Sequence, residues 1–268
     1  MDCVRSNQFT IKGQWQIPDI KQIDKIPTGD MPGDKVQINN NHVAKAQVVF
    51  PKLLELLMPI LNSSPNHKAV IAVHGGSGVG KSEIGSLLNY YLNEYGIGSY
   101  VLSGDNYPHR IPKYNDAERY RIFRTNGIKG LIASDVYTQE NRTILEKLIE
   151  SDQDADPQKA VEHPWLSVYQ KEGIAALKAY LGTDLEIDFA QINNIIADFK
   201  NGTPAIMLRR MGREANELWY EPVSFINKNV MIIEWTHGNN SRIEGIDLPI
   251  LLNSTPQETL EHRKLRNR

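Results

Sequence analysis

The sequence is poor in cysteine, in net charge and in long apolar stretches, and each shortage excludes a class of protein. Its 268 residues contain one cysteine, Cys3, which excludes an internal disulfide framework and suits a reducing compartment. The formal net charge is only −2, so the chain as a whole has no strong attraction for nucleic acid or anionic membranes. The N-terminus lacks the apolar region of a secretion signal, and no stretch approaches the length of a membrane span. We expect a soluble, cytoplasmic protein that binds neither nucleic acid nor membranes.

What the chain does contain is a glycine-rich segment that matches the phosphate-binding pattern Gly-x-x-x-x-Gly-Lys-Ser/Thr at every fixed position. Glycines let backbone N–H groups curl round phosphate oxygens, and the helix that follows turns its positive N-terminus to the same anion. In this pattern Lys81 reaches the β and γ phosphates, and the Ser82 hydroxyl is a ligand of Mg²⁺. The segment predicts a nucleotide-binding loop made of Gly75, Gly76, Ser77, Gly78, Val79, Gly80, Lys81 and Ser82.

The residues on either side of this loop have the pattern that the loop requires. Residues 68–74 form an apolar run without alternation, which is typical of a buried strand in a parallel sheet. After the loop, apolar residues from Ile84 to Tyr95 recur on one helical face, and Gly96 supplies a stop. Strand, loop and helix therefore follow one another in the order that phosphate binding needs.

Two further predicted strands end in carboxylates. Residues 98–103 are followed by Asp105, and residues 230–233 are followed by Glu234. Open α/β sheets form their sites at the carboxyl ends of strands. Asp105 is therefore a candidate base that accepts the proton of a substrate hydroxyl, and Glu234 is a candidate ligand of Mg²⁺, directly or through water. The alternative for Asp105 is ordinary turn chemistry. His237, in the loop after Glu234, is a candidate contact for phosphate or substrate, or else part of a simple turn.

Three arginines follow another predicted strand. The pattern of residues 203–208 predicts a strand, and the proline within it favours a position at a sheet edge. The strand leads into Arg209, Arg210 and Arg213. Guanidinium groups match the geometry of phosphate and carboxylate, so these arginines are candidates for clamping an anionic substrate. A solvated charged turn explains them equally well, and the sequence leaves both interpretations open.

The chain is long enough for one large α/β domain with an inserted subdomain. Residues 1–42 are polar and rich in turn residues, so we expect an N-terminal extension that packs on the core. Residues 43–268 are expected to form the nucleotide-binding domain, with a helical substrate-side insertion at about 106–202. The basic segment at about 255–268 begins with a capping box and is interpreted as a tail or as a lid.

With these pieces in place, the chain resembles the phosphoribulokinase/uridine kinase family over about residues 68–268. The likeness rests on the loop and on Asp105-Asn106-Tyr107, Ile187-Asp188-Phe189, Glu234 and Arg263-Lys264-Leu265-Arg266. It implies a P-loop NTPase three-layer α/β fold with a central parallel sheet and a small-molecule kinase activity. It also implies site roles for Asp105 as the catalytic base, Tyr107 at the substrate, Glu234 near the metal, and Arg263 and Arg266 as lid arginines.

The chain also departs from that family. Where uridine kinases carry a Tyr-Asp-Phe…His-x-Arg segment for the nucleoside, residues 208–213 here read Leu-Arg-Arg-Met-Gly-Arg. That difference favours an anionic, hydroxylated substrate such as a sugar phosphate or sugar acid. Chains of the family continue past the lid, so we expect the natural protein to extend beyond Arg268.

The sequence therefore predicts a kinase that uses ATP and Mg²⁺ to phosphorylate a hydroxyl of a small metabolite. A nucleoside kinase and a nucleotide-binding sensor without turnover remain alternatives. A regulatory GTPase is disfavoured, because residues 227–230 read Asn-Lys-Asn-Val where guanine recognition needs Asn-Lys-x-Asp. The oligomeric state cannot be read from the sequence, and a homodimer remains open.

Overall fold

The computed structural model describes residues 26–33, 36–255 and 259. They divide into two compact units, one made of the described residues up to Tyr107 and from Asp188 onward, the other of Pro108–Ile187. The second unit is shorter than the insertion expected at about 106–202, because helix α7 (Phe189–Lys200) belongs to the first unit. Within the described ranges, no helix is both long enough and apolar enough to cross a membrane.

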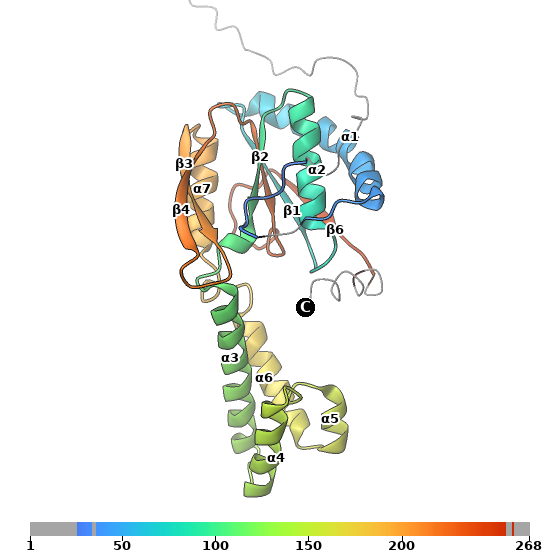
Figure 1. The fold of residues 1–268 in the computed structure, drawn as a ribbon, viewed down its shortest axis with the longest axis vertical. Coiled ribbons are helices and arrows are strands. Elements are labelled where there is room, and N and C mark those ends of the chain that lie inside the picture. Colours follow the sequence, from blue (N-terminus) through green and yellow to red (C-terminus); the bar gives the residue numbers. More distant parts are fainter. Residues whose placement is uncertain (1–25, 34–35, 256–258, 260–268) are drawn as a thin grey trace, which may run out of the picture. The chain divides into compact units, whose positions relative to one another are not determined.

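The first unit is built on a sheet of four parallel strands in the order β2, β5, β1, β6 (Figure 1). Their bounds are Ala69–Gly75 for β1, Ser99–Ser103 for β2, Val230–Glu234 for β5 and Leu248–Leu252 for β6. Every residue of β5 is buried, as the apolar run without alternation predicts for an inner strand. The predicted α/β class with a central parallel sheet is confirmed.

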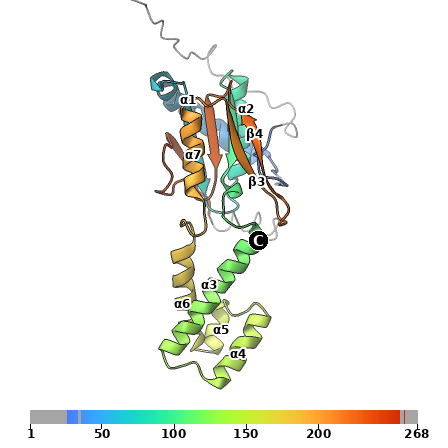
Figure 2. The ribbon, with the colours of Figure 1, turned by 90° about the vertical axis from the view of Figure 1, so that its left-hand side faces the viewer.

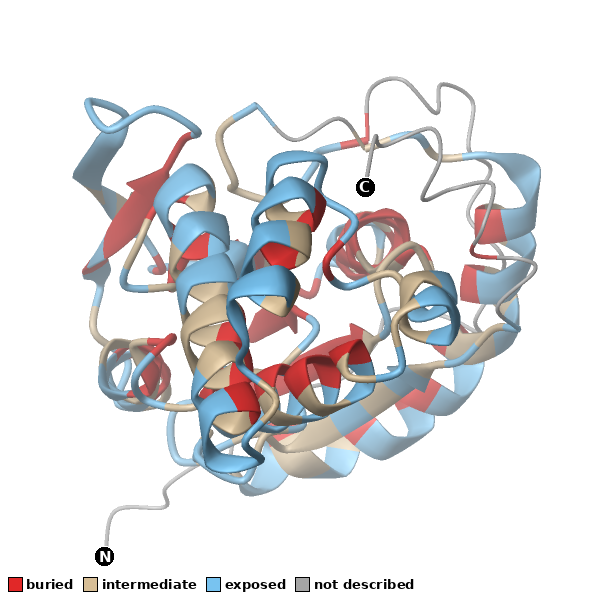
Figure 3. Cartoon of the chain, turned by 90° about the horizontal axis from the view of Figure 1, so that it is seen from below, coloured by how far each residue is buried: buried red, intermediate tan, exposed pale blue. Residues whose placement is uncertain are grey.

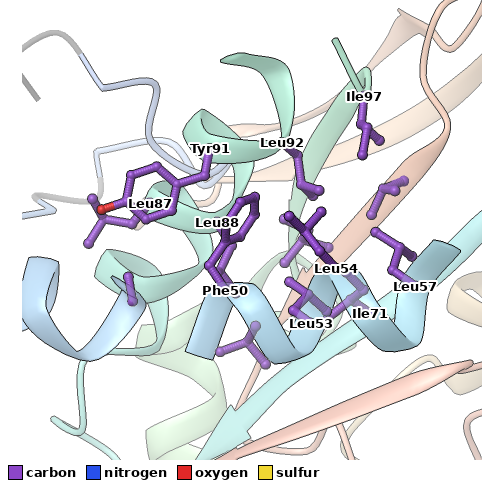
Figure 4. Close-up of a cluster of buried hydrophobic side chains, with 14 of the residues drawn as sticks. Phe50, Leu53, Leu54, Leu57, Ile71, Leu87, Leu88, Tyr91, Leu92 and Ile97 are labelled. Carbon is purple, nitrogen blue, oxygen red and sulfur yellow. The ribbon is translucent and has the colours of Figure 1, made fainter. Parts of the chain in front are cut away.

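Helices α1 (Asn40–Ser63) and α2 (Lys81–Glu94) cover one face of this sheet. The Asn39 side chain caps α1 by accepting hydrogen bonds from the first turn, and α1 continues through Pro51. Both helices turn apolar faces to the strands, and Figure 4 shows Phe50, Leu54 and Leu88 among the side chains that fill the space between them. This core holds α2, the helix that begins at the end of the glycine-rich loop, against the sheet.

Helix α7 lies on the opposite side of the sheet from α2 (Figure 2). The chain passes through α2 from β1 to β2 and returns through α7 towards β5, and right-handed crossovers in opposite directions place their helices on opposite faces. Phe189 at the start of α7 packs on Trp235 just after β5, and Phe199 near its end packs on Phe225. The helix agrees with the helical character expected for residues 106–202.

The register of the strands brings their carboxyl ends to one level. Glu234 of β5 is paired with Val73 of β1 on one side and with Ser103 of β2 on the other. The loops that follow these three residues therefore start side by side at one edge of the sheet, which is where an open α/β sheet forms a site.

A separate antiparallel hairpin is formed by β3 (Ala205–Met211) and β4 (Leu218–Ser224). Arg209 and Arg210 lie within β3, paired with Tyr220 and Trp219, so the solvated charged turn, one of the two interpretations left open, is wrong for these two residues. The strand continues through them because both side chains are buried on the hairpin rather than solvated. Strand β4 was not predicted, since it contains a proline and is largely exposed.

The second unit is helical and has its own core. Its helices are α3 (Pro112–Ala133), α4 (Gln139–Glu150), α5 (Pro157–Glu162) and α6 (Leu166–Tyr180). Helices α3 and α6 pack closely because Gly127 and Gly173 leave room for the rings of Tyr169 and Phe123. Figure 3 shows helices with buried residues on one side and exposed residues on the other, as packing on a shared core requires. The short helix α5 was not predicted.

Candidate active site

The glycine-rich loop between β1 and α2 has a backbone shape that depends on its glycines. Gly75, Gly78 and Gly80 have φ angles of +148°, +80° and +91°, which L-residues rarely adopt. A Cβ atom at Gly75 would lie 2.2 Å from the Leu252 carbonyl oxygen of β6, closer than any side chain tolerates. The loop therefore turns sharply at the end of β1 and leads directly into the N-terminus of α2, the arrangement that an anion-binding loop needs.

Lys81 and Ser82 open helix α2 and point to different parts of the site. The Lys81 ammonium donates a 2.9 Å hydrogen bond to the Gly76 carbonyl oxygen, so it lies across the loop. The Ser82 hydroxyl donates a 3.1 Å hydrogen bond to Glu234 Oε2 at the end of β5. The two residues predicted as metal ligands are therefore in direct contact, although 152 positions separate them in the chain.

Glu234 is a buried carboxylate whose pKa is raised by its surroundings. Only 5% of its surface is exposed, and its other oxygen, Oε1, accepts a 2.6 Å hydrogen bond from the Ser103 hydroxyl. The pKa of Glu234 is raised to about 8, chiefly by burial and next by the negative charge of Asp105, against the opposite effect of the hydrogen bonds from Ser103 and Ser82. A cation beside Oε2 would favour the ionised form of this carboxylate.

The oxygens gathered here suit magnesium. A Mg²⁺ ion bound with a nucleotide usually takes one or two protein oxygens and completes its shell with phosphate oxygens and water. Ser82 Oγ and Glu234 Oε2 supply such a pair beside a loop shaped for phosphate. The residues present therefore fit a magnesium nucleotide.

Asp105 lies in a 3-10 turn, Gly104–Asn106, that follows β2 directly. The turn is packed tightly, because a Cβ atom at Gly104 would lie 2.0 Å from Trp235 Cγ. Asp105 itself is exposed, and its charge acts on Glu234, so the two carboxylates share one edge of the sheet. The expectation that the carboxyl ends of β2 and β5 bring Asp105 and Glu234 together agrees with this geometry.

Arg210 has a structural role that the sequence did not reveal. Its guanidinium donates to Asp30 Oδ2 at 2.7 Å, to Glu221 Oε1 at 2.8 Å and to the Tyr100 hydroxyl at 3.0 Å. With these groups of the protein as its partners, Arg210 is not the substrate clamp that its position in a charged segment predicted. It ties the hairpin to the neighbouring segments instead.

The other two arginines of that segment differ from Arg210. Arg209 is 5% exposed, and its Nε atom is buried with no hydrogen-bond partner in the part of the chain that the structure describes. Arg213 is exposed at the turn of the hairpin, where its backbone N–H donates to Glu217 at 2.8 Å. Binding of an anionic substrate by Arg209 or Arg213 stays a prediction, with Arg209 buried and Arg213 at the surface.

The remaining predicted site residues have different positions. Tyr107 is completely buried, which contradicts its expected place on the substrate surface, and its ring supports the turn from the interior. His237 is partly exposed and packs edge-on against Trp235 with a centroid distance of 5.2 Å, so its contact with phosphate or substrate stays a prediction. Arg263 and Arg266, the predicted lid arginines, lie outside the described residues.

Two polar residues join this site without having been predicted, Asp30 and Ser103. Asp30 accepts hydrogen bonds from residues between 70 and 180 positions away, and no local pattern in its turn-rich segment predicts such contacts. Ser103 is the last residue of β2, so its position at a strand end was the one available signal.

Comparison with known proteins finds one similar sequence and one similar fold. No family model matches the chain. The bifunctional alpha-galactosidase/sucrose kinase AgaSK of Mediterraneibacter gnavus is 35% identical over 217 residues, which cover 81% of this chain and 18% of that protein. The chain thus spans less than a fifth of the curated relative it matches. A crystal structure described as a candidate fructose transport system kinase from Silicibacter sp. TM1040 has a TM-score of 0.50 at 14% identity, covering 82% of this chain and 80% of that one, and shows a shared fold.

Proposed function

We propose that this chain is an ATP-dependent kinase that transfers the γ-phosphoryl group to a hydroxyl of a small sugar or sugar derivative. The observation that carries the proposal is the contact between Ser82 Oγ and Glu234 Oε2 at the end of a glycine loop, with Asp105 at the same sheet edge. The residues proposed to bind the nucleotide, to hold the metal and to act as the base come from three separate segments of the chain. Their meeting at one edge is what phosphoryl transfer requires, and it supports a P-loop NTPase fold.

Each residue has a distinct task in this proposal. The loop N–H groups and Lys81 bind the β and γ phosphates, and Ser82 and Glu234 hold Mg²⁺ directly or through water. The bound metal supplies charge neutralisation on the phosphates. Asp105, exposed at the sheet edge, accepts the proton of the acceptor hydroxyl. Catalysis is therefore mainly positioning and electrostatic stabilisation.

The acceptor class follows from the relatives and from one arginine. The relative AgaSK carries a sucrose kinase in its name, and the solved structure is described as a fructose transport system kinase. Both names point to a sugar hydroxyl as the acceptor. Arg209 adds a preference for an acceptor with an anionic group, because its buried Nε–H has no partner among the described residues and would gain an acceptor in a phosphate or carboxylate oxygen.

The test is ADP release measured with a panel of acceptors. The panel contains sucrose, fructose, sugar phosphates, sugar acids and uridine, each with ATP and Mg²⁺. We expect stimulation by at least one sugar and stronger stimulation by a sugar that bears an anionic group. Stimulation by uridine alone would support the nucleoside kinase alternative. ATP binding without stimulation by any member would support the sensor alternative and reject the kinase.

A further inference from the structure

We propose that Asp30, in the segment 26–33 ahead of α1, is a positioning residue for the phosphoryl-transfer site. It holds the turn that carries Asp105 and, through Ser103, the carboxylate of Glu234. The inference rests on the proposed kinase function and adds to it a residue from a part of the chain that carries no recognised motif. In Figure 1 the segment is the dark blue trace that reaches the turn after β2.

One oxygen of Asp30 binds both sides of the turn that carries Asp105. Asp30 Oδ1 accepts a 2.7 Å hydrogen bond from the Ser103 backbone N–H and a 3.1 Å hydrogen bond from Asn106 Nδ2. Ser103 precedes the turn Gly104–Asn106, and Asn106 ends it. A single carboxylate oxygen therefore fixes the two ends of a three-residue turn, which sets the position of the residue between them.

The same turn is anchored on its far side to the hairpin. Asn106 Oδ1 accepts a 2.9 Å hydrogen bond from the Met211 backbone N–H at the end of β3. The Asn106 side chain thus bridges Asp30 and β3, with its amide nitrogen on one and its oxygen on the other. Such a bridge is specific, because an amide offers a donor and an acceptor in fixed directions.

From Ser103 the contacts continue to the metal side of the site. The Ser103 hydroxyl donates to Glu234 Oε1 at 2.6 Å, and Glu234 Oε2 accepts from Ser82 in the loop. The backbone at Gly29 also lies against this carboxylate, since a Cβ atom there would be 3.7 Å from Glu234 Oε1. Residues 29 and 30 therefore help to exclude water from Glu234 and to fix its orientation.

The other oxygen of Asp30 is held by two groups that keep the carboxylate in place. Asp30 Oδ2 accepts from Arg210 Nη1 at 2.7 Å and from the Tyr100 hydroxyl at 2.8 Å. The Asp30 side chain is only 7% exposed, so its four donors satisfy a carboxylate that has almost no access to water. The rival explanation is that Asp30 serves only to neutralise Arg210.

The first experiment compares Asp30→Asn with Glu221→Gln. Glu221 is the second carboxylate partner of Arg210, but it is 47% exposed and accepts no hydrogen bond from Ser103 or Asn106 among the described residues. We expect Asp30→Asn to lower kcat by about 10- to 100-fold, with KM for ATP and acceptor changed by less than about threefold. Glu221→Gln should keep kcat within about twofold of the parent chain. Equal effects of the two variants would overturn the proposal.

The double variant Asp30→Asn with Arg210→Met separates positioning from charge neutralisation. It removes both members of the buried ion pair, a change that often leaves stability intact. If Asp30 only neutralised Arg210, the double variant would regain the parent kcat. We expect its melting temperature to recover while its kcat stays low, because Ser103 and Asn106 still lack their charged acceptor.

A readout independent of turnover keeps the inference distinct from the proposed function. Hydrogen–deuterium exchange of peptides covering residues 99–107 should become faster in Asp30→Asn and stay unchanged in Glu221→Gln. This holds even if no acceptor is ever phosphorylated, in which case the proposed function fails and the exchange result alone decides the inference. If Asp30→Asn does not fold, Asn106→Ala tests the same turn, and an unchanged kcat in that variant rejects the positioning role.

Discussion

The Ser82 hydroxyl donates a 3.1 Å hydrogen bond to Glu234 Oε2, and this contact joins the glycine-rich loop to the end of a central strand. Both residues are buried, and Glu234 is held from its other side by Ser103. The position of each oxygen is therefore determined by the fold before any ligand arrives. Preorganised oxygens of this kind favour a cation over the solvent, because little reorganisation is needed on binding.

The first prediction concerns the Ser82 hydroxyl. Ser82→Ala should raise the Mg²⁺ concentration for half-maximal activity by about 10- to 100-fold, since the metal loses a ligand and Glu234 loses a hydrogen bond. The measurement is a Mg²⁺ titration of ADP release. Ser86→Ala is the matched control, because Ser86 lies one turn later on α2, is fully buried, and has an Oγ atom without a partner among the described residues. Equal shifts in the two variants would contradict a ligand role for Ser82.

The second prediction separates chemistry from binding at Asp105. Asp105→Asn should lower turnover by about 10²- to 10⁴-fold, because the amide cannot accept the proton of the acceptor hydroxyl. The Kd of ATP should stay within about threefold, because Asp105 belongs to the turn after β2 and its proposed partner is the acceptor hydroxyl rather than the nucleotide. Asp198→Asn, at an exposed position of α7, serves as the control. Unchanged turnover in Asp105→Asn would remove this residue as the base.

The sequence predicts those parts of the site whose signals are local. The pattern of Gly75 to Ser82, the apolar run before it and the helical periodicity after it each fall within a few residues. Asp105 and Glu234 were placed correctly at strand ends because parallel strands share one edge for their carboxyl ends. Physical rules of short range were sufficient for these elements.

Long-range pairing accounts for what the sequence did not show. Three arginines close together look alike in a sequence. Only the fold shows that Arg210 is paired with Asp30, 180 residues away, while the buried Nε atom of Arg209 has no partner among the described residues. Tyr107 resembles a substrate residue by its position beside Asp105, yet its ring is turned into the interior. Side-chain direction within a turn depends on the packing around it, which no spacing rule contains.

The third prediction uses two adjacent glycines of the loop. Gly75→Ala should lower the free energy of unfolding by about 2 kcal/mol or more, because its Cβ atom would lie 2.2 Å from Leu252 and its φ is +148°. Gly76→Ala should change it by less than about 0.5 kcal/mol, since the nearest atom to its Cβ would be 3.8 Å away. Urea unfolding of both variants is the measurement. Similar losses in the two would show that the loop's shape does not depend on Gly75.

The last prediction concerns Arg209, whose buried Nε–H has no hydrogen-bond partner among the described residues, an arrangement that costs stability unless a bound anion supplies the acceptor. Arg209→Met keeps a long side chain and removes the charge, so without acceptor it should raise the free energy of unfolding by about 1 kcal/mol. The same variant should raise KM for an anionic sugar by about tenfold or more and leave KM for a neutral sugar nearly unchanged.

Arg213→Met is the matched control for that prediction, because Arg213 belongs to the same hairpin but is exposed. We expect it to alter neither the free energy of unfolding nor the preference between anionic and neutral acceptors. If Arg209→Met raises KM equally for both kinds of acceptor, Arg209 shapes the site without binding a charge. A protein that is stabilised by losing Arg209 but then binds the anionic acceptor poorly would show that the buried cation is retained for substrate recognition.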